Sequence, residues 1–545
     1  MHNTFLTRLS RPQIADFYAG GHWQDTTIYG YVRRHSADTP DRVAIRGTHG
    51  AVTFSELFDA AERLAGHLDT AGLHVGQRVA VWLSSRTEAA VALVTCSKLG
   101  LVMSPSLHRT HTVEEVVGFL QTMRAAAFIG EIGHGADGAS ADVFGLATAL
   151  PMMGPVLRVP PPDATDDRLF AEIDAATAPL DSREDPDSIV YLAFTSGTTG
   201  TPKGVLHSDN TLLANARALA TDWQIDADSV VYSFSPVSHN LGFGSMVMSL
   251  MAGAEFVVHD VPRGASLSER LRSTGATFVV GVPTHAIDLV AELDAGADPV
   301  TTVRGFRLSG ASGSRDVVSS LLGHGILPQS GYGMTEGGSH HYTLPTDDIR
   351  TVTETSGRAC SGFEVRVFDP QDPTRALGTG EEGHIGCRGA SLMLGYYDDQ
   401  AGTEDAFNAD GWFMTGDLGW LDEAGYIRVT GRIKDVIIRG GHNIHPAHIE
   451  DLAMRHADVA VAAAIPVADE RLGERVCLVI ATRNGGTVEP AELMSHLAAE
   501  GLSRFDMPEF VARVDALPLT ASGKILKRAL IDALAEGSLL AEPVS

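Results

Sequence analysis

Short runs of apolar residues alternate along much of the chain with segments whose apolar residues recur at helical spacing. Residues 78–83 have the pattern of a buried strand, and Thr87–Leu99 has Ala, Val and Leu at the spacing of a helix. Two further strand patterns, 256–258 and 278–283, are separated by a helical pattern at 267–273. This alternation predicts an α/β fold with mostly parallel sheets.

The pattern changes in the last third of the chain. Residues 362–430 contain more turns and short strands, which predicts a β-rich subdomain within the first domain. Strands and helices then alternate again in a compact α+β unit, in which residues 448–455 are predicted to form a helix. Because 545 residues exceed the size of a single core, we predict a large N-terminal domain of residues 1–433 and a small C-terminal domain of residues 434–545, with the boundary near Lys434.

The charge balance excludes some classes of partner. The chain has 41 basic and 68 acidic residues, a formal net charge of −27. Nucleic acids and anionic membranes would be repelled at long range, so neither is expected to be a general partner. A small anionic substrate is compatible with this charge, because a local cationic pocket can overcome the field of the whole protein.

The cysteines and the N-terminus bear on the cellular compartment. Four cysteines are widely scattered without a CxxC spacing, which predicts neither a disulfide framework nor a zinc site. Charges and a proline stand where a signal peptide needs an apolar run, and no stretch approaches the roughly 18 apolar residues of a spanning helix. We therefore expect a soluble, cytoplasmic protein.

One short segment has the composition of a phosphate-binding loop. Residues 195–204, TSGTTGTPKG, follow an apolar strand pattern at 189–194 and contain three glycines, four threonines and Lys203. Glycines let backbone N–H groups turn towards an anion, hydroxyls add donors, and a lysine adds charge. A flexible surface turn would not require the threonines or the lysine. The Walker pattern GxxxxGK[ST] is not met, so the P-loop class is excluded.

Further motifs follow this loop in a fixed order. They are SGYGMTE (330–336), GWFMTGD (411–417), GRIKDVIIRGGHNIHPAHIE (431–450) and LPLTASGKILKR (517–528). Together with YLAFTSGTTGTPKGVLHS (191–208), they resemble the motifs of the adenylate-forming superfamily, which contains acyl-CoA synthetases, adenylation domains and luciferases. The resemblance implies two half-reactions: a carboxylate attacks the α-phosphorus of ATP and releases pyrophosphate, and a thiol then displaces AMP.

The resemblance implies roles for residues at the phosphates of ATP. Thr335 would contact the α-phosphate, and Glu336 would bind Mg²⁺ with Thr199 nearby. Lys524 would be the main catalytic residue, a mobile cation that bridges the acid's oxygen and the α-phosphate. The β- and γ-phosphates would be held by the loop residues Thr195, Ser196, Gly197, Thr198, Thr199, Gly200 and Lys203.

Other residues would hold the nucleoside. Tyr332 would either stack on adenine or serve as a core aromatic, and both readings stay open. Asp417 would accept hydrogen bonds from the ribose hydroxyls, with help from Arg432. Gly310, Ala311 and Ser312 would lie beneath the base, and Gly331 and Gly333 are also expected to bind the nucleotide.

The C-terminal domain is expected to be mobile. In the family it rotates between the two half-reactions, and Lys434 occupies the hinge position. Gly440 and Gly441 would let the backbone approach the pantetheine arm of CoA. The chain departs from the family pattern with histidines at 442, 445 and 448. A shared metal site is not expected, because Pro446 interrupts any helix that would carry all three.

The acyl pocket is expected around residues 235–244, SPVSHNLGFG. Amino-acid-activating relatives place an aspartate here, whereas this chain has His239 and Asn240, which disfavours an α-amino acid. The pair resembles that of aryl-acid activators, but a histidine that only gates or packs is an equal alternative. The segment after Glu336 looks like that of ligases for alicyclic acids, and Gly310, Gly333 and Gly338 suggest room for a compact ring or a medium chain. Gly244 and Gly338 are expected to line the pocket with His239 and Asn240.

These observations predict an ATP- and Mg²⁺-dependent carboxylic acid–CoA ligase that forms AMP. Its partners would be a small cyclic, aryl or medium-chain acid and CoA, and a homo-oligomer is possible. One alternative is a stand-alone enzyme that loads the phosphopantetheine arm of a separate carrier protein. The other is a non-catalytic nucleotide-binding relative, which the presence of Lys524, Glu336 and Asp417 disfavours.

Overall fold

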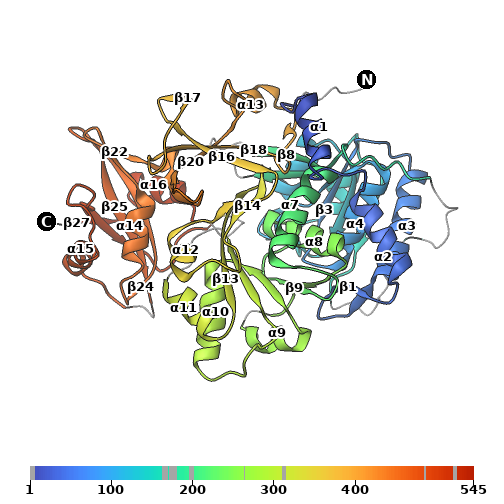
Figure 1. Cartoon of the computed structure of the whole chain (residues 1–545), viewed down its shortest axis with the longest axis horizontal. Coiled ribbons are helices and arrows are strands. Elements are labelled where there is room, and N and C mark those ends of the chain that lie inside the picture. Colours follow the sequence, from blue (N-terminus) through green and yellow to red (C-terminus); the bar gives the residue numbers. More distant parts are fainter. Residues whose placement is uncertain are drawn as a thin grey trace. The chain divides into compact units, whose positions relative to one another are not determined.

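The computed structural model describes residues 7–162, 170, 173, 181–195, 202–262, 264–309, 315–483, 486–519 and 525–544 (Figure 1). Two compact units share the chain. The first combines Met1–Glu364 with Arg388–Phe407, and the second combines Val365–Cys387 with Asn408–Ser545. Most of the β-rich segment therefore clusters with the C-terminal residues, whereas its residues Arg388–Phe407 cluster with the first unit. The domain boundary near Lys434 stays a prediction.

The first sheet of unit 1 has seven strands in the order β19-β8-β7-β4-β3-β5-β6. Its five parallel strands are β3 (Arg78–Trp82), β4 (Val102–Ser104), β5 (Ala125–Glu131), β6 (Val156–Val159) and β7 (Ile189–Thr195). Two antiparallel strands, β8 (Lys203–Ser208) and β19 (Gly395–Tyr396), complete the edge beside β7. Helix α4 (Thr87–Leu99) has the predicted bounds and is buried along its length.

The second sheet has nine strands in the order β15-β14-β13-β12-β11-β9-β10-β1-β2. The parallel strands are β1 (Val43–Arg46), β9 (Val230–Ser233), β10 (Glu255–Val258), β11 (Phe278–Gly281), β12 (Gly305–Ser309) and β13 (Leu327–Met334). The antiparallel strands are β2 (Ala51–Thr53), β14 (Gly338–Tyr342) and β15 (Arg358–Ala359). These sheets confirm the predicted α/β class.

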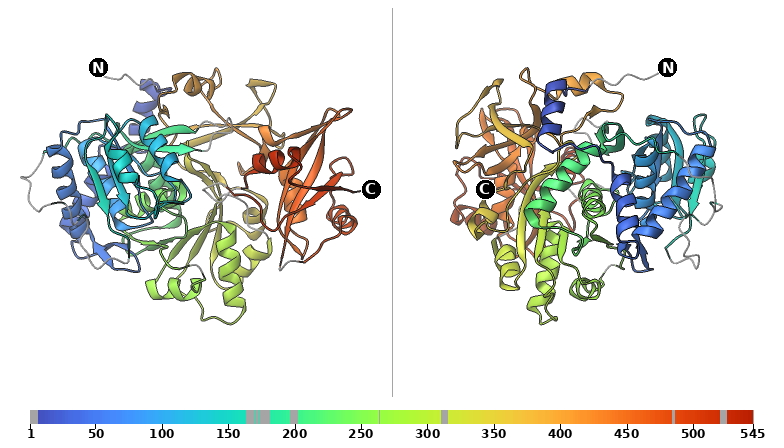
Figure 2. Two further views of the ribbon diagram at one scale, coloured as in Figure 1. Left: turned by 180° about the vertical axis from the view of Figure 1, so that it is seen from behind. Right: turned by 45° about the vertical axis from the view of Figure 1, so that its right-hand side comes forward.

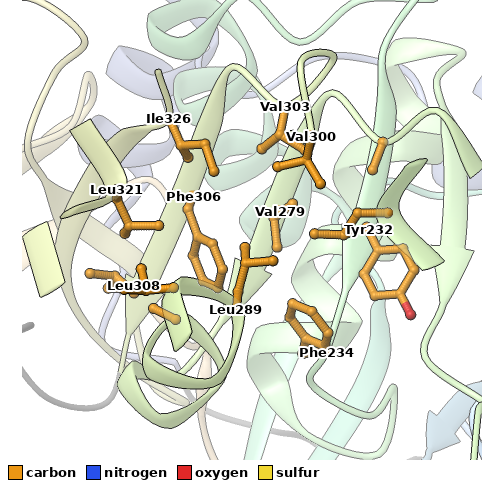
Figure 3. Packing of buried hydrophobic residues seen from close by; sticks show 14 of the residues in the cluster. Tyr232, Phe234, Val279, Leu289, Val300, Val303, Phe306, Leu308, Leu321 and Ile326 are labelled. Atoms are coloured by element: carbon orange, nitrogen blue, oxygen red, sulfur yellow. The ribbon is translucent and has the colours of Figure 1, made fainter. Parts of the chain in front are cut away.

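A hydrophobic core fills one face of this second sheet (Figure 3). Phe306 and Leu308 of β12 pack there with Leu289 of α10 (Pro283–Asp294) and Leu321 of α11 (Arg315–Gly323). The strand predicted at 278–283 ends earlier, at Gly281, because Pro283 begins α10. A proline fits the first helical position, where its missing N–H is not needed.

The remaining described helices of unit 1 precede, connect or follow these strands along the chain. They are α1 (Arg11–Ala19), α2 (Ile28–Asp38), α3 (Phe54–Thr70), α5 (Val113–Thr122), α6 (Val143–Thr148), α7 (Asp209–Trp223), α8 (Asn240–Ala252), α9 (Leu267–Thr274), α12 (Ile349–Glu354) and α13 (Gln400–Asp405). Helices α7 and α8 contact each other, and both contact β14. They therefore cover the second sheet at β14, the strand that pairs with β13 and its SGYGMTE motif.

Unit 2 contains two sheets. The first has the order β17-β16-β18-β20-β21, with strands β16 (Phe363–Asp369), β17 (Asp372–Ala376), β18 (Gly383–Gly389), β20 (Phe413–Leu421) and β21 (Ile427–Arg432). The second comprises β22 (Ile437–Arg439), β23 (His442–Ile444), β24 (Val459–Asp469), β25 (Gly473–Thr482), β26 (Phe510–Arg513) and β27 (Ala541–Pro543). Figure 2 shows these C-terminal strands, in orange to red, flanked by helices. The predicted β-rich and α+β segments are confirmed.

The helices of unit 2 bear on whether the histidines at 442, 445 and 448 share one helix. They are η1 (Ile433–Asp435), α14 (Pro446–Ala453), α15 (Pro490–Ala499) and α16 (Lys527–Ala535). Helix α14 begins at Pro446, two residues before the predicted start, because proline again occupies the first helical turn. His442 lies in β23 and His445 caps α14, so only His448 is inside the helix. The predicted interruption by Pro446 is confirmed.

The structure also shows the state of the four cysteines and the hydropathy of the described helices. Cys96, Cys360, Cys387 and Cys477 are all free thiols buried in the fold. Among the helices in the described ranges, none has both the length and the apolar character needed to cross a bilayer.

Candidate active site

The glycine- and threonine-rich loop connects two antiparallel strands. β7 and β8 form a hairpin whose last described pair is Thr195 opposite Lys203. The residues between them that were predicted to hold phosphates, Ser196, Gly197, Thr198, Thr199 and Gly200, lie outside the described residues. The structure therefore fixes both ends of the loop, and the phosphate contacts themselves stay a prediction.

Lys203, Tyr396 and Glu336 lie together beside this hairpin. The Lys203 Nζ is 4.5 Å from the centre of the Tyr396 ring, which is a cation–π contact. The Tyr396 hydroxyl donates a hydrogen bond to Glu336 Oε1 at 3.0 Å. Burial, and then the Glu336 carboxylate, raises the pKa of Tyr396, so the phenol keeps the proton that it donates. One tyrosine thus connects the lysine of the loop with the predicted metal ligand.

Backbone pairing brings Tyr396 to this position. β19 pairs antiparallel with β8, and Tyr396 lies opposite Val205. The sequence analysis did not identify Tyr396, because it is far from both partners along the chain and no motif includes it. A buried two-residue strand of this kind has no periodicity from which its neighbours can be inferred.

A buried histidine holds the backbone at Thr335. His207 Nε2 lies 2.8 Å from the carbonyl oxygen of Thr335, and His207 Nδ1 lies 3.0 Å from Thr211 Oγ1. Burial lowers the pKa of His207 to about 4, so its ring is neutral at physiological pH. Because a carbonyl can only accept, Nε2 carries the proton and Nδ1 accepts from the hydroxyl. His207 was also missed, although a histidine inside an apolar strand pattern is a signal that could have found it.

The glycines around β13 are required by close packing. A Cβ at Gly331 would lie 2.8 Å from Arg307 Nη2, and a Cβ at Gly333 would lie 2.3 Å from the carbonyl oxygen of Gly338. Tyr332, between them, makes an edge-on contact with His340 at 5.0 Å between ring centres. Its stacking on adenine stays a prediction, and Gly310, Ala311 and Ser312 lie outside the described residues.

In unit 2, the predicted ribose residues form an ion pair. Asp417 on β20 lies opposite Arg432 on β21, and Arg432 Nε donates to Asp417 Oδ1 at 3.1 Å. Asp417 is 7% exposed, whereas Arg432 is exposed. The backbone before Asp417 is fixed by the Gly416 N–H, which donates to His384 Nε2 at 2.9 Å. The carboxylate is therefore held in place and largely buried, and its hydrogen bonds to a ribose stay a prediction.

The predicted hinge and CoA residues also lie in unit 2. Lys434 is exposed in η1. Gly440 and Gly441 form the turn between β22 and β23, with φ angles of 59° and 87° that favour glycine. This backbone requirement explains both glycines without CoA, so their contact with a pantetheine arm stays a prediction. Lys524, the predicted catalytic residue, lies outside the described residues.

Three predicted acyl-pocket residues line one cavity in unit 1. Asn240, Gly244 and Gly338 surround a space of about 30 Å³, which is also lined by Arg307 and Met248. A benzene-sized ligand needs a cavity on the order of 150 Å³, so a ring would enter only if the wall moved. Met248 belongs to that wall, and methionine side chains adapt readily.

His239, the fourth predicted residue, is not part of this lining. It caps the N-terminus of α8, and its ring lies 6.4 Å from that of His108. Burial, followed by the neighbouring His111 and His239, lowers the pKa of His108 to about 4. Asn240, in contrast, donates from its amide to the carbonyl oxygen of Met334 at 3.4 Å, directly before Thr335. The cavity and the SGYGMTE turn are thereby in contact.

Another residue that the sequence analysis missed fixes β14. The amide of Asn215, on α7, accepts from the Ser339 N–H at 3.0 Å and donates to the Ser339 carbonyl oxygen at 3.1 Å. Gly338 has a φ of 70°, and a Cβ there would lie 2.9 Å from Asn215 Oδ1, so the position requires glycine. The cavity wall at Gly338 is therefore rigidly held.

These features together define an adenylate-forming enzyme: a glycine- and threonine-rich hairpin with a lysine, a linked carboxylate, and a neighbouring cavity lined by α8 and β14. Residues 32–397 match the AMP-binding enzyme family, and residues 448–524 match the AMP-binding enzyme C-terminal domain. Because the first match covers more than half of the chain, the chain belongs to the AMP-binding enzyme family.

Similar proteins span nearly the whole chain. A medium-chain fatty-acid–CoA ligase of Escherichia coli (strain K12) is 30% identical over 513 residues, which are 93% of this chain and 90% of that protein. A salicylyl-CoA synthase / salicylate adenylyltransferase of a Streptomyces species is 32% identical over 541 residues, which are 95% of this chain and 96% of that protein. The crystal structure of ATP-bound MatB from Rhodopseudomonas palustris has a TM-score of 0.80 at 28% identity and covers 94% of this chain and 99% of that one.

Proposed function

We propose that this protein is an ATP-dependent carboxylic acid–CoA ligase of the AMP-forming kind. Membership of the AMP-binding enzyme family and its similarity to acid–CoA ligases support this activity. The observation that carries the proposal is the connection of Lys203 to Glu336 through Tyr396, at the end of the glycine- and threonine-rich hairpin. A cation and a carboxylate that contact the same tyrosine suit a polyphosphate and the metal ion that neutralises it.

The first half-reaction requires two anions to approach each other. Such a reaction is accelerated mainly by positioning and by neutralising charge. Lys203 and the loop would hold the β- and γ-phosphates, and Glu336 would hold Mg²⁺, a hard ion that prefers carboxylate and phosphate oxygens. The hydrogen bond from His207 to the Thr335 carbonyl would keep both Thr335 and Glu336 in place. Lys524 would supply the cation between the acid and the α-phosphate.

The nucleoside and the thiol would be bound by residues of unit 2. The Asp417 carboxylate would accept hydrogen bonds from the ribose, and Arg432 would fix its orientation. Lys434 would be the hinge about which the C-terminal domain moves, and the turn at Gly440 and Gly441 would pass close to the pantetheine arm of CoA. The movement would remove Lys524 from the adenylate before the thiol attacks.

The acid would bind in the cavity between α8 and β14. Its lining by Asn240, Gly244 and Gly338 supports a compact cyclic, aryl or medium-chain acyl group. None of these three residues is an acid that could pair with a substrate ammonium group, which supports exclusion of α-amino acids. Met248 would move to admit a ring.

Measuring AMP and thioester separately tests the proposal. The protein would be incubated with ATP, Mg²⁺, CoA and a panel of cyclic, aryl and linear acids. We expect AMP and acyl-CoA in equal amounts for at least one acid. AMP production without a free CoA thioester would favour loading of a carrier protein, and the absence of acid-dependent turnover would favour a non-catalytic nucleotide-binding protein.

A further inference from the structure

A buried arginine in the acyl cavity has hydrogen-bond donors without partners. Arg307, on β12, is 1% exposed and lines the cavity. Its Nη1 donates to Gln329 Oε1 at 2.6 Å. Its Nε and Nη2 have no hydrogen-bond partner among the described residues. These two N–H groups lie side by side on a guanidinium, the arrangement that binds both oxygens of one carboxylate.

The position of Arg307 follows from strand alternation. Its neighbours Phe306 and Leu308 enter the hydrophobic core on the side of α10 and α11 (Figure 3). Side chains alternate between the two faces of a strand, so Arg307 projects to the other face, where α7 and α8 lie. Gly331 on the adjacent strand leaves room for it, since a Cβ there would lie 2.8 Å from Nη2.

No anion in the described part of the chain balances this charge. Arg307 forms no ion pair with a described carboxylate; its guanidinium instead lies 5.6 Å from the centre of the Tyr342 ring. Burial lowers the pKa of Arg307 to about 10, so it is still a cation at neutral pH. An unpaired buried charge is strongly unfavourable, and proteins normally pair such a group or use it to bind a ligand.

Other unpartnered polar atoms lie on neighbouring strands. His340 and His341 contact each other through their Nδ1 atoms at 2.6 Å, and within the described residues their Nε2 atoms have no partner. Gln329 Nε2 also has no hydrogen-bond partner among the described residues. Burial lowers the pKa of both histidines, so neither supplies a second charge at neutral pH. The guanidinium is therefore the charged group among these unpartnered side chains.

The size of the cavity fits a small oxygen-containing group. A space of about 30 Å³ corresponds to about two water-sized groups, since one water needs on the order of 10–15 Å³ on this measure. Two oxygens of one carboxylate have this size. The space next to Arg307 therefore matches the end of an acid better than its ring or chain.

We propose that Arg307 binds a second carboxylate on the substrate, so that the preferred acid is a dicarboxylic acid with its reacting carboxylate at the other end. This inference rests on the proposed function. It makes Arg307 a residue that determines specificity: Nε and Nη2 donate to the two oxygens of the distal carboxylate, and Nη1 keeps its hydrogen bond to Gln329.

Matched acids test the preference. The kcat/KM for AMP formation is measured for cyclohexane-1,4-dicarboxylate against cyclohexanecarboxylate, for adipate against hexanoate, and for 4-oxocyclohexanecarboxylate. We expect the diacid to be favoured at least tenfold on one of the two scaffolds. A preference for the monoacid on both, or for the oxo acid over the diacid, would overturn the proposal. If only monoacids react, the diacid proposal is contradicted and the proposed ligase function stands. If no acid reacts, the proposed ligase function itself is contradicted.

A pair of variants tests the residue. In Arg307→Met the diacid preference should fall at least tenfold, with the monoacid changed much less. Arg304→Met, an exposed arginine three residues earlier, should keep the preference. Equal losses for both acids in Arg307→Met would show a structural role and overturn the proposal.

Thermal stability gives a readout that does not depend on turnover. With AMP present, the diacid should raise the melting temperature of the unmodified protein more than its matched monoacid does. Without ligand, Arg307→Met should melt at the same or a higher temperature, because it removes an unpaired buried charge. Equal shifts with the diacid and the monoacid would contradict binding of the second carboxylate, even if Arg307→Met failed to fold.

Discussion

The two ends of the site in unit 1 differ in how their polar groups are paired. At the predicted ATP end, Lys203, Glu336 and the Thr335 carbonyl each contact a protein partner, through Tyr396 or His207. At the proposed acid-binding end, Arg307 retains donors that no described residue satisfies. Groups fixed in advance are suited to stabilising a transition state, because they need no reorganisation during the reaction. Groups without a partner are suited to selecting the ligand that satisfies them.

The largest effect is expected at Lys524. Lys524→Ala should slow adenylate formation by about 10²-fold or more, because a preorganised charge at the transition state contributes effects of that size. Thioester formation from a preformed adenylate should be nearly unchanged. Single-turnover measurements of the two steps check this, with Lys527→Ala as the control. Equal losses in both steps would contradict the assigned role.

Glu336→Gln should have the next largest effect. It removes the carboxylate charge while keeping the shape of the side chain, and we expect kcat to fall by about 10²-fold with a higher Mg²⁺ requirement. Steady-state rates over a Mg²⁺ titration measure both changes. The control variant Glu354→Gln alters an exposed glutamate that pairs with Arg350. It should change neither kcat nor the Mg²⁺ requirement. An unchanged Mg²⁺ dependence in Glu336→Gln would exclude Glu336 as the metal ligand.

Tyr396→Phe should have a smaller effect of the same kind. The ring beneath Lys203 is kept, and only the hydrogen bond to Glu336 is lost, which is worth about 1.5–3 kcal/mol for a charged acceptor. We expect kcat/KM for ATP to fall by about tenfold. The matched control is Tyr397→Phe, which removes a hydroxyl that donates to the Met123 carbonyl. Similar losses in both variants would mean that Tyr396 acts on the fold rather than on Glu336.

The smallest effect is expected in the pH dependence of stability. His207 has a pKa of about 4 in the folded protein, lowered by burial from the ordinary value of 6.5. Between these two values the unfolded chain therefore binds more protons than the folded protein. The contribution of His207 to the free energy of unfolding is fully present above pH 6.5 and is lost as the pH falls towards 4. Between pH 4 and 6.5, His207→Gln should reduce the slope of the free energy of unfolding against pH by up to about 1.4 kcal/mol per pH unit.

Denaturant titrations between pH 4.5 and 7 measure this slope. The exposed His49 provides the control variant, His49→Gln. The partly buried His108 and His285 and the buried His341 also have lowered pKa values, so the unmodified protein should lose stability steeply over the same range. An unchanged slope in His207→Gln would mean that His207 is not held neutral in the folded protein.

Much of the fold was predictable because its signals are local. Helix α4 followed from the spacing of its apolar residues, and β7 from an apolar run next to a glycine-rich loop. The strand predicted at 278–283 was too long, and α14 begins earlier than predicted, because in both cases a proline was not taken as a helix start. The motifs that resemble the adenylate-forming superfamily singled out Glu336 and Asp417, whose roles stay predictions.

The residues that were missed depend on contacts between distant segments. Tyr396 reaches Glu336 only because β19 adds to the edge of the first sheet, and Asn215 reaches Ser339 only because α7 packs on β14. Arg307 lies in a strand whose neighbours are apolar, and its importance follows from its missing partners rather than from any motif. Such features require the tertiary structure, since pairing and burial are not encoded in the spacing of residues.

A crystal structure with a non-hydrolysable ATP analogue and Mg²⁺ tests the central claim most directly. The account predicts that the β- and γ-phosphates lie against residues 195–203, within hydrogen-bond distance of the Lys203 Nζ. It also predicts that the Glu336 carboxylate is a direct Mg²⁺ ligand, at about 2.0–2.1 Å. A triphosphate bound away from the hairpin, or a metal ion without contact to Glu336, would contradict it.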